Sequence, residues 1–291
     1  AEQVIGRDVP LSALQDVDAF LASQADAPLR EVLARGAGWG LLHERRTGRR
    51  LGPGLSFETA LGGEERPWSE LLTLGTFSAQ TLAERPRSYA VSAGWVSVLQ
   101  ASMKARGATA LHHLHLGVAQ AEAGALEEAR ASFEASLALQ PNAAAHRNLA
   151  LLLERGGDPD SAQGAYSRAW KLCGGDRSLA VEFCSFLLRH KREPAFETFV
   201  ALAPPEVASH ERIQLMRAQL ALTRGDYPAV RQLLQREYST IREGELSLSE
   251  LWFASFIQEA EQRKGGALTE AEKQSLMDAN PPPRTIDFRM K

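Results

Sequence analysis

A period of about 33 residues constrains the fold of this chain more than any other feature. A glycine, an alanine and an aromatic position recur at that spacing: Gly124 and Gly157; Ala129, Ala162 and Ala195; Phe133, Tyr166 and Phe199. A repeating unit of this length is typical of helical repeat proteins, in which each unit buries its apolar face against its neighbours. At least three units are usually needed for stability, and this chain has enough.

The clearest unit, Ala110 to Pro141, has the spacing of a tetratricopeptide repeat, a helix-turn-helix of about 34 residues. Gly117 and Ala129 are small, as is needed where two helices cross closely, and Phe133 fills the space beside them. Pro141 ends the second helix because it has no backbone N–H to continue it. The sequence therefore predicts paired helices in this stretch.

The predicted fold class is all-α: a right-handed α-solenoid of tetratricopeptide-type helix pairs with N-terminal and C-terminal helical extensions. We expect residues 1–107 to form an N-terminal helical region with a long loop at 47–66. Residues 108–245 are predicted to hold about four repeat units. Residues 246–291 are predicted to form C-terminal capping helices followed by an extended tail.

Local signals place several element boundaries. Asp158 is expected to cap the helix that Pro159 opens, and Gly225-Asp226 precede the helix at Tyr227 in the same manner. Capping-box spacing links Ser247 to Glu250 and Thr269 to Glu272. In the N-terminal region, apolar periodicity predicts helices over 11–23, from Pro28 to Gly36, from Trp39, from Pro67 to Leu72, and from Tyr89 to Arg106 with a stop at Gly107.

The tail runs from Asn280 through three prolines, which impose an extended path. It carries Ile286, Phe288 and Met290, and we expect it to be disordered unless a groove holds these side chains.

Composition excludes several function classes. A net charge of -3 and a pI near 6.2 argue against a general nucleic-acid binder, which would show a basic footprint. No apolar run reaches the length of a membrane span or reads as a signal peptide, so a soluble, cytoplasmic protein is expected. Cys173 and Cys184 lack the spacing of a zinc site, and both are predicted to be buried small apolar residues.

In such solenoids one face of each first helix lines a concave groove. Counted from Gly117, the groove positions include Leu111, Leu114, Val118, Arg147, Leu151, Glu154, Arg177, Cys184 and Leu187. This surface is mainly apolar, and such a surface is rarely left open to water. Three covers are considered: the chain's own N-terminal helices or tail, another domain, or a helical partner. Self-coverage is slightly favoured.

Reactive side chains give little support for chemistry. His112 and His115 stand three apart on a predicted helix and could meet one metal ion, but no nearby Cys, Asp or Glu completes a ligand set. Neither a catalytic triad spacing nor a phosphate loop is present. No catalytic residue, metal or cofactor is therefore predicted, and the chain is not expected to be an enzyme.

Beyond the repeat, the chain resembles the C-terminal part of an uncharacterised family in which a mutarotase-like, carbohydrate-associated β-sandwich precedes tetratricopeptide repeats. The residues that carry this resemblance are GAGWG at 36–40, Pro67-Trp68, Gly94-Trp95, SLSELWF at 247–253 and PPPRTIDFRM at 281–290. The resemblance implies a natural C-terminus and, with the Ala1 start, a cut downstream of another domain. No catalytic residue transfers, because the β-sandwich is absent from this chain.

The function predicted is a non-enzymatic scaffold that contacts a protein or peptide partner, or another domain of the same protein, through its groove. The alternative is an accessory helical region of a carbohydrate-active enzyme whose catalytic β-sandwich is not in this chain. In that case Trp39, Trp68 or the 47–66 loop could stack on a sugar, although tryptophans of this kind more often belong to the core. Neither the partner nor the oligomeric state follows from the sequence.

Overall fold

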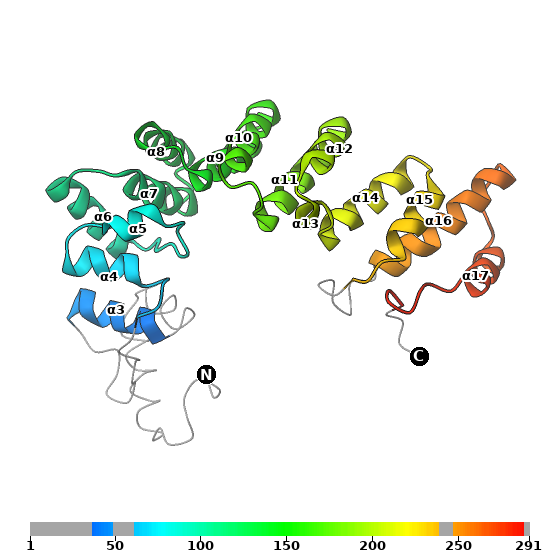
Figure 1. Ribbon diagram of the computed structural model, residues 1–291, viewed down its shortest axis with the longest axis horizontal. Coiled ribbons are helices and arrows are strands. Elements are labelled where there is room, and N and C mark those ends of the chain that lie inside the picture. Colours follow the sequence, from blue (N-terminus) through cyan, green and yellow to red (C-terminus); the bar gives the residue numbers. More distant parts are fainter. Residues whose placement is uncertain (1–36, 49–60, 239–246, 288–291) are drawn as a thin grey trace, which may run out of the picture. The chain divides into compact units, whose positions relative to one another are not determined.

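The structure is a computed structural model that describes residues 37–48, 61–238 and 247–287. Within these ranges the regular elements are helices and none is a strand. Many helices pack against the next helix along the chain, as α7 does with α8 (Figure 1) and α14 with α15, and this confirms the predicted all-α class of tetratricopeptide-type helix pairs. The chain divides into two compact units, residues 1–169 and 170–291. The predicted three-part division stays a prediction.

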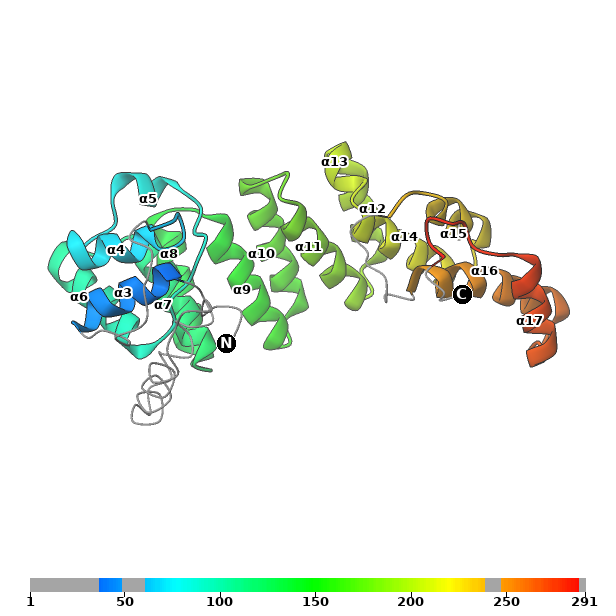
Figure 2. The same ribbon diagram turned by 90° about the horizontal axis from the view of Figure 1, so that it is seen from below.

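The first unit begins with four helices: α3 (Ala37–Thr47), α4 (Arg66–Thr73), α5 (Ala79–Ala83) and α6 (Ala93–Arg106). Contacts run from α3 to α4, from α4 to α6 and from α6 to the first repeat helix, and Figure 2 shows α3 beside α4. The predicted helices at 11–23 and up to Gly36, and most of the 47–66 loop, lie outside the described residues. The five-residue α5 is a helix that the sequence analysis did not predict.

Three tryptophans hold these helices together. Trp68 lies with its ring centroid 5.4 Å from that of Trp95, and Trp39 lies 6.2 Å from each. All three are at most 5% exposed. The helix predicted from Tyr89 begins only at Ala93, because Ser92 has the extended backbone of an N-cap residue. Its predicted end is confirmed.

Two repeat units follow, with α7 (Ala110–Glu122) and α8 (Leu126–Leu139) in the first, and α9 (Ala143–Arg155) and α10 (Pro159–Leu172) in the second. The predicted close crossing is present: a Cβ added at Gly117 would lie 2.6 Å from Cε1 of Phe133. The predicted cap at the start of α10 is present: Oδ1 of Asp158 accepts a hydrogen bond from the N–H of Ser161 at 3.0 Å.

The second unit contains α11 (Arg177–Arg189), α12 (Glu193–Leu202), α13 (Pro205–Ala208), α14 (Glu211–Thr223), α15 (Tyr227–Leu234), α16 (Ser247–Lys264) and α17 (Glu270–Ala279). The short α13, which begins at the second of two prolines, interrupts the regular alternation of helix pairs. The predicted caps at Asp226 and Thr269 are confirmed, the latter as a full capping box with Glu272.

The C-terminal segment packs against this unit. Ile286 is fully buried in the core formed by α14, α15 and α16. Ser249 donates a hydrogen bond to the carbonyl of Ile286 at 2.6 Å, and the indole N–H of Trp252 donates to the carbonyl of Asn280 at 3.0 Å. The tail is thus held at Asn280 and Ile286, whereas Phe288 and Met290 lie outside the described residues.

Candidate functional site

The structure places the predicted groove residues of the first unit in two different environments. Leu111 and Leu114, on α7, are 9% and 2% exposed and belong to the same core as Trp68 and Trp95. The N-terminal helices therefore share one core with these two positions, which is the self-coverage that the sequence analysis favoured. Val118 is half-buried and packs against the edge of this core.

The face of α9 remains more open. Arg147, Leu151 and Glu154 are each half-buried rather than buried. They are spaced by four and three residues, so they lie on one face of the helix. Arg147 donates a hydrogen bond from Nη1 to Oδ1 of Asn148 at 3.0 Å. This face brings together a cation, an apolar side chain and an anion.

In the second unit the predicted groove residues on α11 also differ. Arg177 is exposed, whereas Cys184 and Leu187 are fully buried. Burial raises the pKa of the Cys184 thiol to about 12. Cys184 and Leu187 are core residues in this conformation and offer no surface to a partner. Cys173, which was predicted to be buried, is only half-buried.

The histidines of α7 lie at the contact between the first repeat and the N-terminal helices, and they do not converge on a metal. His112 makes hydrogen bonds with both ring nitrogens: Nε2 lies 2.8 Å from Oγ of Ser102, and Nδ1 accepts from the backbone N–H of Thr109 at 3.3 Å. Among the described residues, no group of three His, Cys, Asp or Glu side chains could hold a metal ion.

His115 is 2% exposed and lies among aromatic rings. Its ring centroid is 4.7 Å from that of Trp68, 5.2 Å from Tyr89 and 5.7 Å from Phe77. Within the part of the chain that the structure describes, neither ring nitrogen has a hydrogen-bond partner. Burial, with a smaller contribution from His112, lowers the pKa of His115 to about 3.

A cavity of about 10 Å³ adjoins His115. Arg66, Arg85, Arg87 and Glu84 contribute to its lining, and Arg66 pairs with Glu84. This volume corresponds to about one water molecule. It is too small for a sugar ring or a phosphate group, so we assign no ligand to it.

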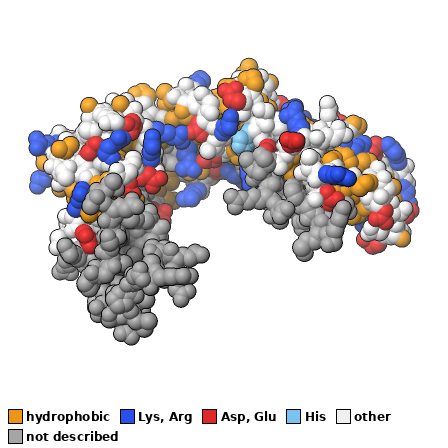
Figure 3. Space-filling model, turned by 60° about the horizontal axis from the view of Figure 1, so that its bottom comes forward, with side chains coloured by type: hydrophobic (Ala, Val, Ile, Leu, Met, Phe, Trp, Pro, Cys, Tyr) orange, Lys and Arg blue, Asp and Glu red, His pale blue; other side chains and the backbone are white. Residues whose placement is uncertain are grey.

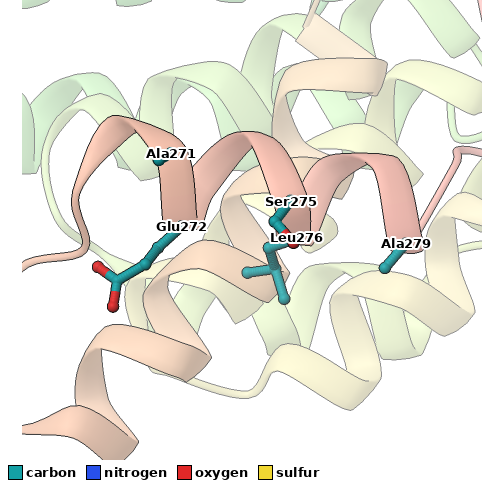
Figure 4. Close-up of a pocket in the computed structure, with 5 residues that line it drawn as sticks. All are labelled: Ala271, Glu272, Ser275, Leu276 and Ala279. Atoms are coloured by element: carbon teal, nitrogen blue, oxygen red, sulfur yellow. The ribbon is translucent and has the colours of Figure 1, made fainter.

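Another surface hollow lies along one side of α17, with Ala271, Glu272, Ser275, Leu276 and Ala279 as its lining (Figure 4). It is wide open to solvent and contains no cluster of reactive groups. No catalytic arrangement follows from it.

Several contacts at the histidines were not predicted from the sequence. Thr109 stands three residues before His112, and this spacing of a capping box, with histidine in place of glutamate, was an available signal. Ser102, Phe77 and Tyr89 gave no such signal, because their approach to α7 depends on the path of the N-terminal helices.

The tryptophans proposed for a sugar site do not form one. Trp39 is 3% exposed and Trp68 is fully buried, so neither ring face is available to stack on a sugar. The interpretation of both as core residues is confirmed. The role suggested for them in the carbohydrate alternative is therefore wrong.

The distribution of charge on the surface and the hydropathy of the helices bear on which kinds of partner the chain could contact. Figure 3 shows lysine and arginine side chains interspersed with aspartate and glutamate on the face in view. Across the parts of the chain that the structure describes, no helix combines the length and the apolar character needed to cross a bilayer.

Comparison with known proteins gives no family assignment. No family model matches this chain, and no curated protein does. The resemblance to a family with an upstream mutarotase-like domain is therefore not supported.

Two solved structures are similar in part. A tetratricopeptide repeat protein from Parabacteroides merdae ATCC 43184 aligns at 16% identity and a TM-score of 0.45, covering 65% of this chain and 73% of that one. Yeast Tom70 aligns at 12% identity and a TM-score of 0.38, covering 64% of this chain and 38% of that one. These similarities are too distant to indicate a function.

Proposed function

We propose that this chain is a non-enzymatic repeat scaffold that binds a protein or peptide partner, or another domain of the same protein, at the face of α9 carrying Arg147, Leu151 and Glu154. The proposal keeps only the predicted groove positions on α9, which are all partly accessible; Val118 on α7 and Arg177 on α11 are accessible too but are not part of this face. Leu111, Leu114, Cys184 and Leu187 then serve the core.

The observation that carries the proposal is the composition of this face. An apolar side chain, Leu151, stands between a cation and an anion, and all three are partly exposed. Protein interfaces combine apolar centres with polar rims, and arginine is enriched among the residues that contribute most to binding. A net charge of -3 also favours a protein partner over a nucleic acid. We propose the cytoplasm as its location.

The reactive side chains support a non-enzymatic function. His112 and His115 are buried in packing contacts, and the Cys184 thiol is buried with a raised pKa. A nucleophile or general base needs access to its substrate and a pKa near the working pH. No specific observation favours the carbohydrate alternative.

The test is site-specific photo-cross-linking in source cells. A photoreactive phenylalanine analogue replaces Leu151 in one variant and Leu139 in its control, because Leu139 is an exposed leucine (56%) at the end of α8. We expect a discrete protein to be cross-linked from position 151, absent from position 139 and lost when Arg147→Glu is added. Equal labelling from both positions, or labelling insensitive to Arg147→Glu, would contradict the proposal.

A further inference from the structure

The contact between α7 and the N-terminal helices is built around two neutral histidines. The described residues 61–106 cover α7 at Leu111, Leu114 and the two histidines, which are at most 2% exposed. Because both histidines lie within the first unit, the contact concerns one compact body. The two histidines make this contact sensitive to pH, a property that the scaffold function does not require.

The hydrogen bonds of His112 match a neutral ring. Nδ1 accepts from the N–H of Thr109, so the proton of the neutral ring is on Nε2 and is donated to Oγ of Ser102. Ser102 in turn donates to the carbonyl of Gly75 at 2.8 Å. Nδ1 also lies 2.7 Å from Oγ1 of Thr109, which already accepts from the N–H of His112, so a proton on Nδ1 would remove the acceptor for the Thr109 N–H and disturb the capping box at the start of α7.

Among the described residues, no group is hydrogen-bonded to His115 in a way that would stabilise a positive charge on its ring. Its ring nitrogens lack partners, and the neighbouring rings of Trp68, Phe77 and Tyr89 come from three separate segments of the N-terminal region. Aromatic faces attract cations, but the loss of hydration on burying an unpaired ion is the larger effect. The protonated ring is therefore favoured only after these segments move away.

The charged groups around the pair add to this bias. Arg66, Arg85 and Arg87 line the cavity beside His115, and Glu84, the carboxylate in that lining, is paired with Arg66. Glu70 accepts hydrogen bonds from Ser78, the N-cap of α5, and from Thr81 within α5. On α7 itself the titratable neighbour of the pair is His113, and Tyr89 lies near Arg85 and Arg147.

We propose that His112 and His115 form an acid-sensitive latch: their protonation releases residues 61–106 from α7 and exposes the apolar side chains of Leu111 and Leu114. The latch closes at neutral pH, where both rings are uncharged. It opens at mildly acidic pH, where the released rings take up protons. The latch does not depend on the binding face proposed on α9.

The sign of the pH dependence follows from proton linkage. Burial lowers the pKa of His112 to about 4 and that of His115 to about 3, whereas a released histidine titrates near 6.5. The open form therefore binds more protons below pH 6.5, and closure weakens as the pH falls through that value. Between pH 7.5 and 5 the opening equilibrium constant should rise by about 30-fold for each histidine, or about 10³-fold for both.

The experiment measures amide hydrogen exchange of the full chain at pH 7.5 and pH 5, corrected for the intrinsic pH dependence of exchange. We expect peptides from α6 and α7 to lose protection at pH 5 by up to about 10³-fold, while peptides from α14 to α16 change much less. Equal loss of protection in both units, or no selective loss in α6 and α7, would overturn the proposal.

A double variant, His112→Asn with His115→Met, tests whether the histidines cause the effect. Asparagine keeps an acceptor near the position of Nδ1, and methionine packs against aromatic rings without a charge. This variant should keep α6 and α7 protected at pH 5, and His113→Gln, a change at the half-buried neighbour, should behave as the wild type. Acid sensitivity that persists in the double variant would refute the latch.

A second measurement covers the case in which the double variant does not fold. This measurement is an NMR pH titration of the wild-type protein from neutral pH down to pH 5.5. As long as the closed form is the one observed, the ring resonances of His112 and His115 should show no titration near pH 6.5. Either resonance titrating at that pH in the closed form would overturn the proposal.

Discussion

The crossing of α7 and α8 offers the sharpest test of the packing argument. Replacing Gly117 with alanine would place a methyl group 2.6 Å from Cε1 and 2.7 Å from Cδ1 of Phe133. Phe133 is 1% exposed, so its ring cannot move into solvent. Overpacking of a core costs about 1–3 kcal/mol, against a gain of about 1 kcal/mol from removing a glycine inside a helix.

Gly164, inside α10, is the matched control. A Cβ at this position would meet no atom within 4 Å, so Gly164→Ala should show only the helix-propensity gain, about 1 kcal/mol. The difference in the free energy of unfolding between the two variants then isolates the contact with Phe133, and we expect it to be about 1–3 kcal/mol. Urea denaturation followed by circular dichroism and tryptophan fluorescence measures both values.

A third variant adds Phe133→Leu to Gly117→Ala. If the clash causes the loss, the smaller side chain should recover part of it, with a coupling energy of about 1 kcal/mol in the double-mutant cycle. Equal stability of Gly117→Ala and Gly164→Ala would refute the reasoning, because it would mean that the two helices separate without cost.

Two further predictions concern the second unit. Ile286→Ala should lower its free energy of unfolding by about 2–4 kcal/mol, because the side chain is fully buried; a loss below about 0.5 kcal/mol in urea titrations would count against docking of the tail. Thiol labelling at pH 8 should modify Cys173 readily and Cys184 only in denaturant, since a pKa of about 12 leaves a thiolate fraction of about 10⁻⁴. Rapid modification of both thiols in the native protein would contradict this burial.

The features that the sequence predicted well are those set by neighbours along the chain. Asp158, Asp226 and the Thr269–Glu272 pair cap helices as expected, because an N-cap needs only a suitable side chain two or three residues before its donor. The crossing at Gly117 was also predictable, since a repeat fixes which residues of its two helices meet.

The features that the sequence left open depend on distant contacts. The periodicity that marks Leu111 and Leu114 as groove positions is the same whether the groove is open or covered. Whether the groove is open or covered depends on the path of the N-terminal helices. That path rests on contacts such as the hydrogen bond between Ser102 and Gly75, which are 27 residues apart. For the same reason the burial of His112 could not be read from its spacing to His115.

One turn shows packing overriding local preference. The turns of the first, second and fourth repeat units use Gly124, Gly157 and Gly225 with φ between 74° and 80°. The corresponding turn between α11 and α12 places Lys191 at φ 55°, a conformation that a lysine rarely adopts. The packing of the two helices therefore sets this turn, and a glycine is not required for it.

The docked C-terminal segment also bears on the rate at which the second unit folds. Paired helices assemble from contacts between neighbours, and such local contacts form quickly. Ser249 and Ile286 stand 37 residues apart, and their contact must wait for that loop to close. The helix pairs should therefore form first, and the tail should pack against them afterwards. The last part of the core to exclude water then lies where α14, α15 and α16 contact Ile286.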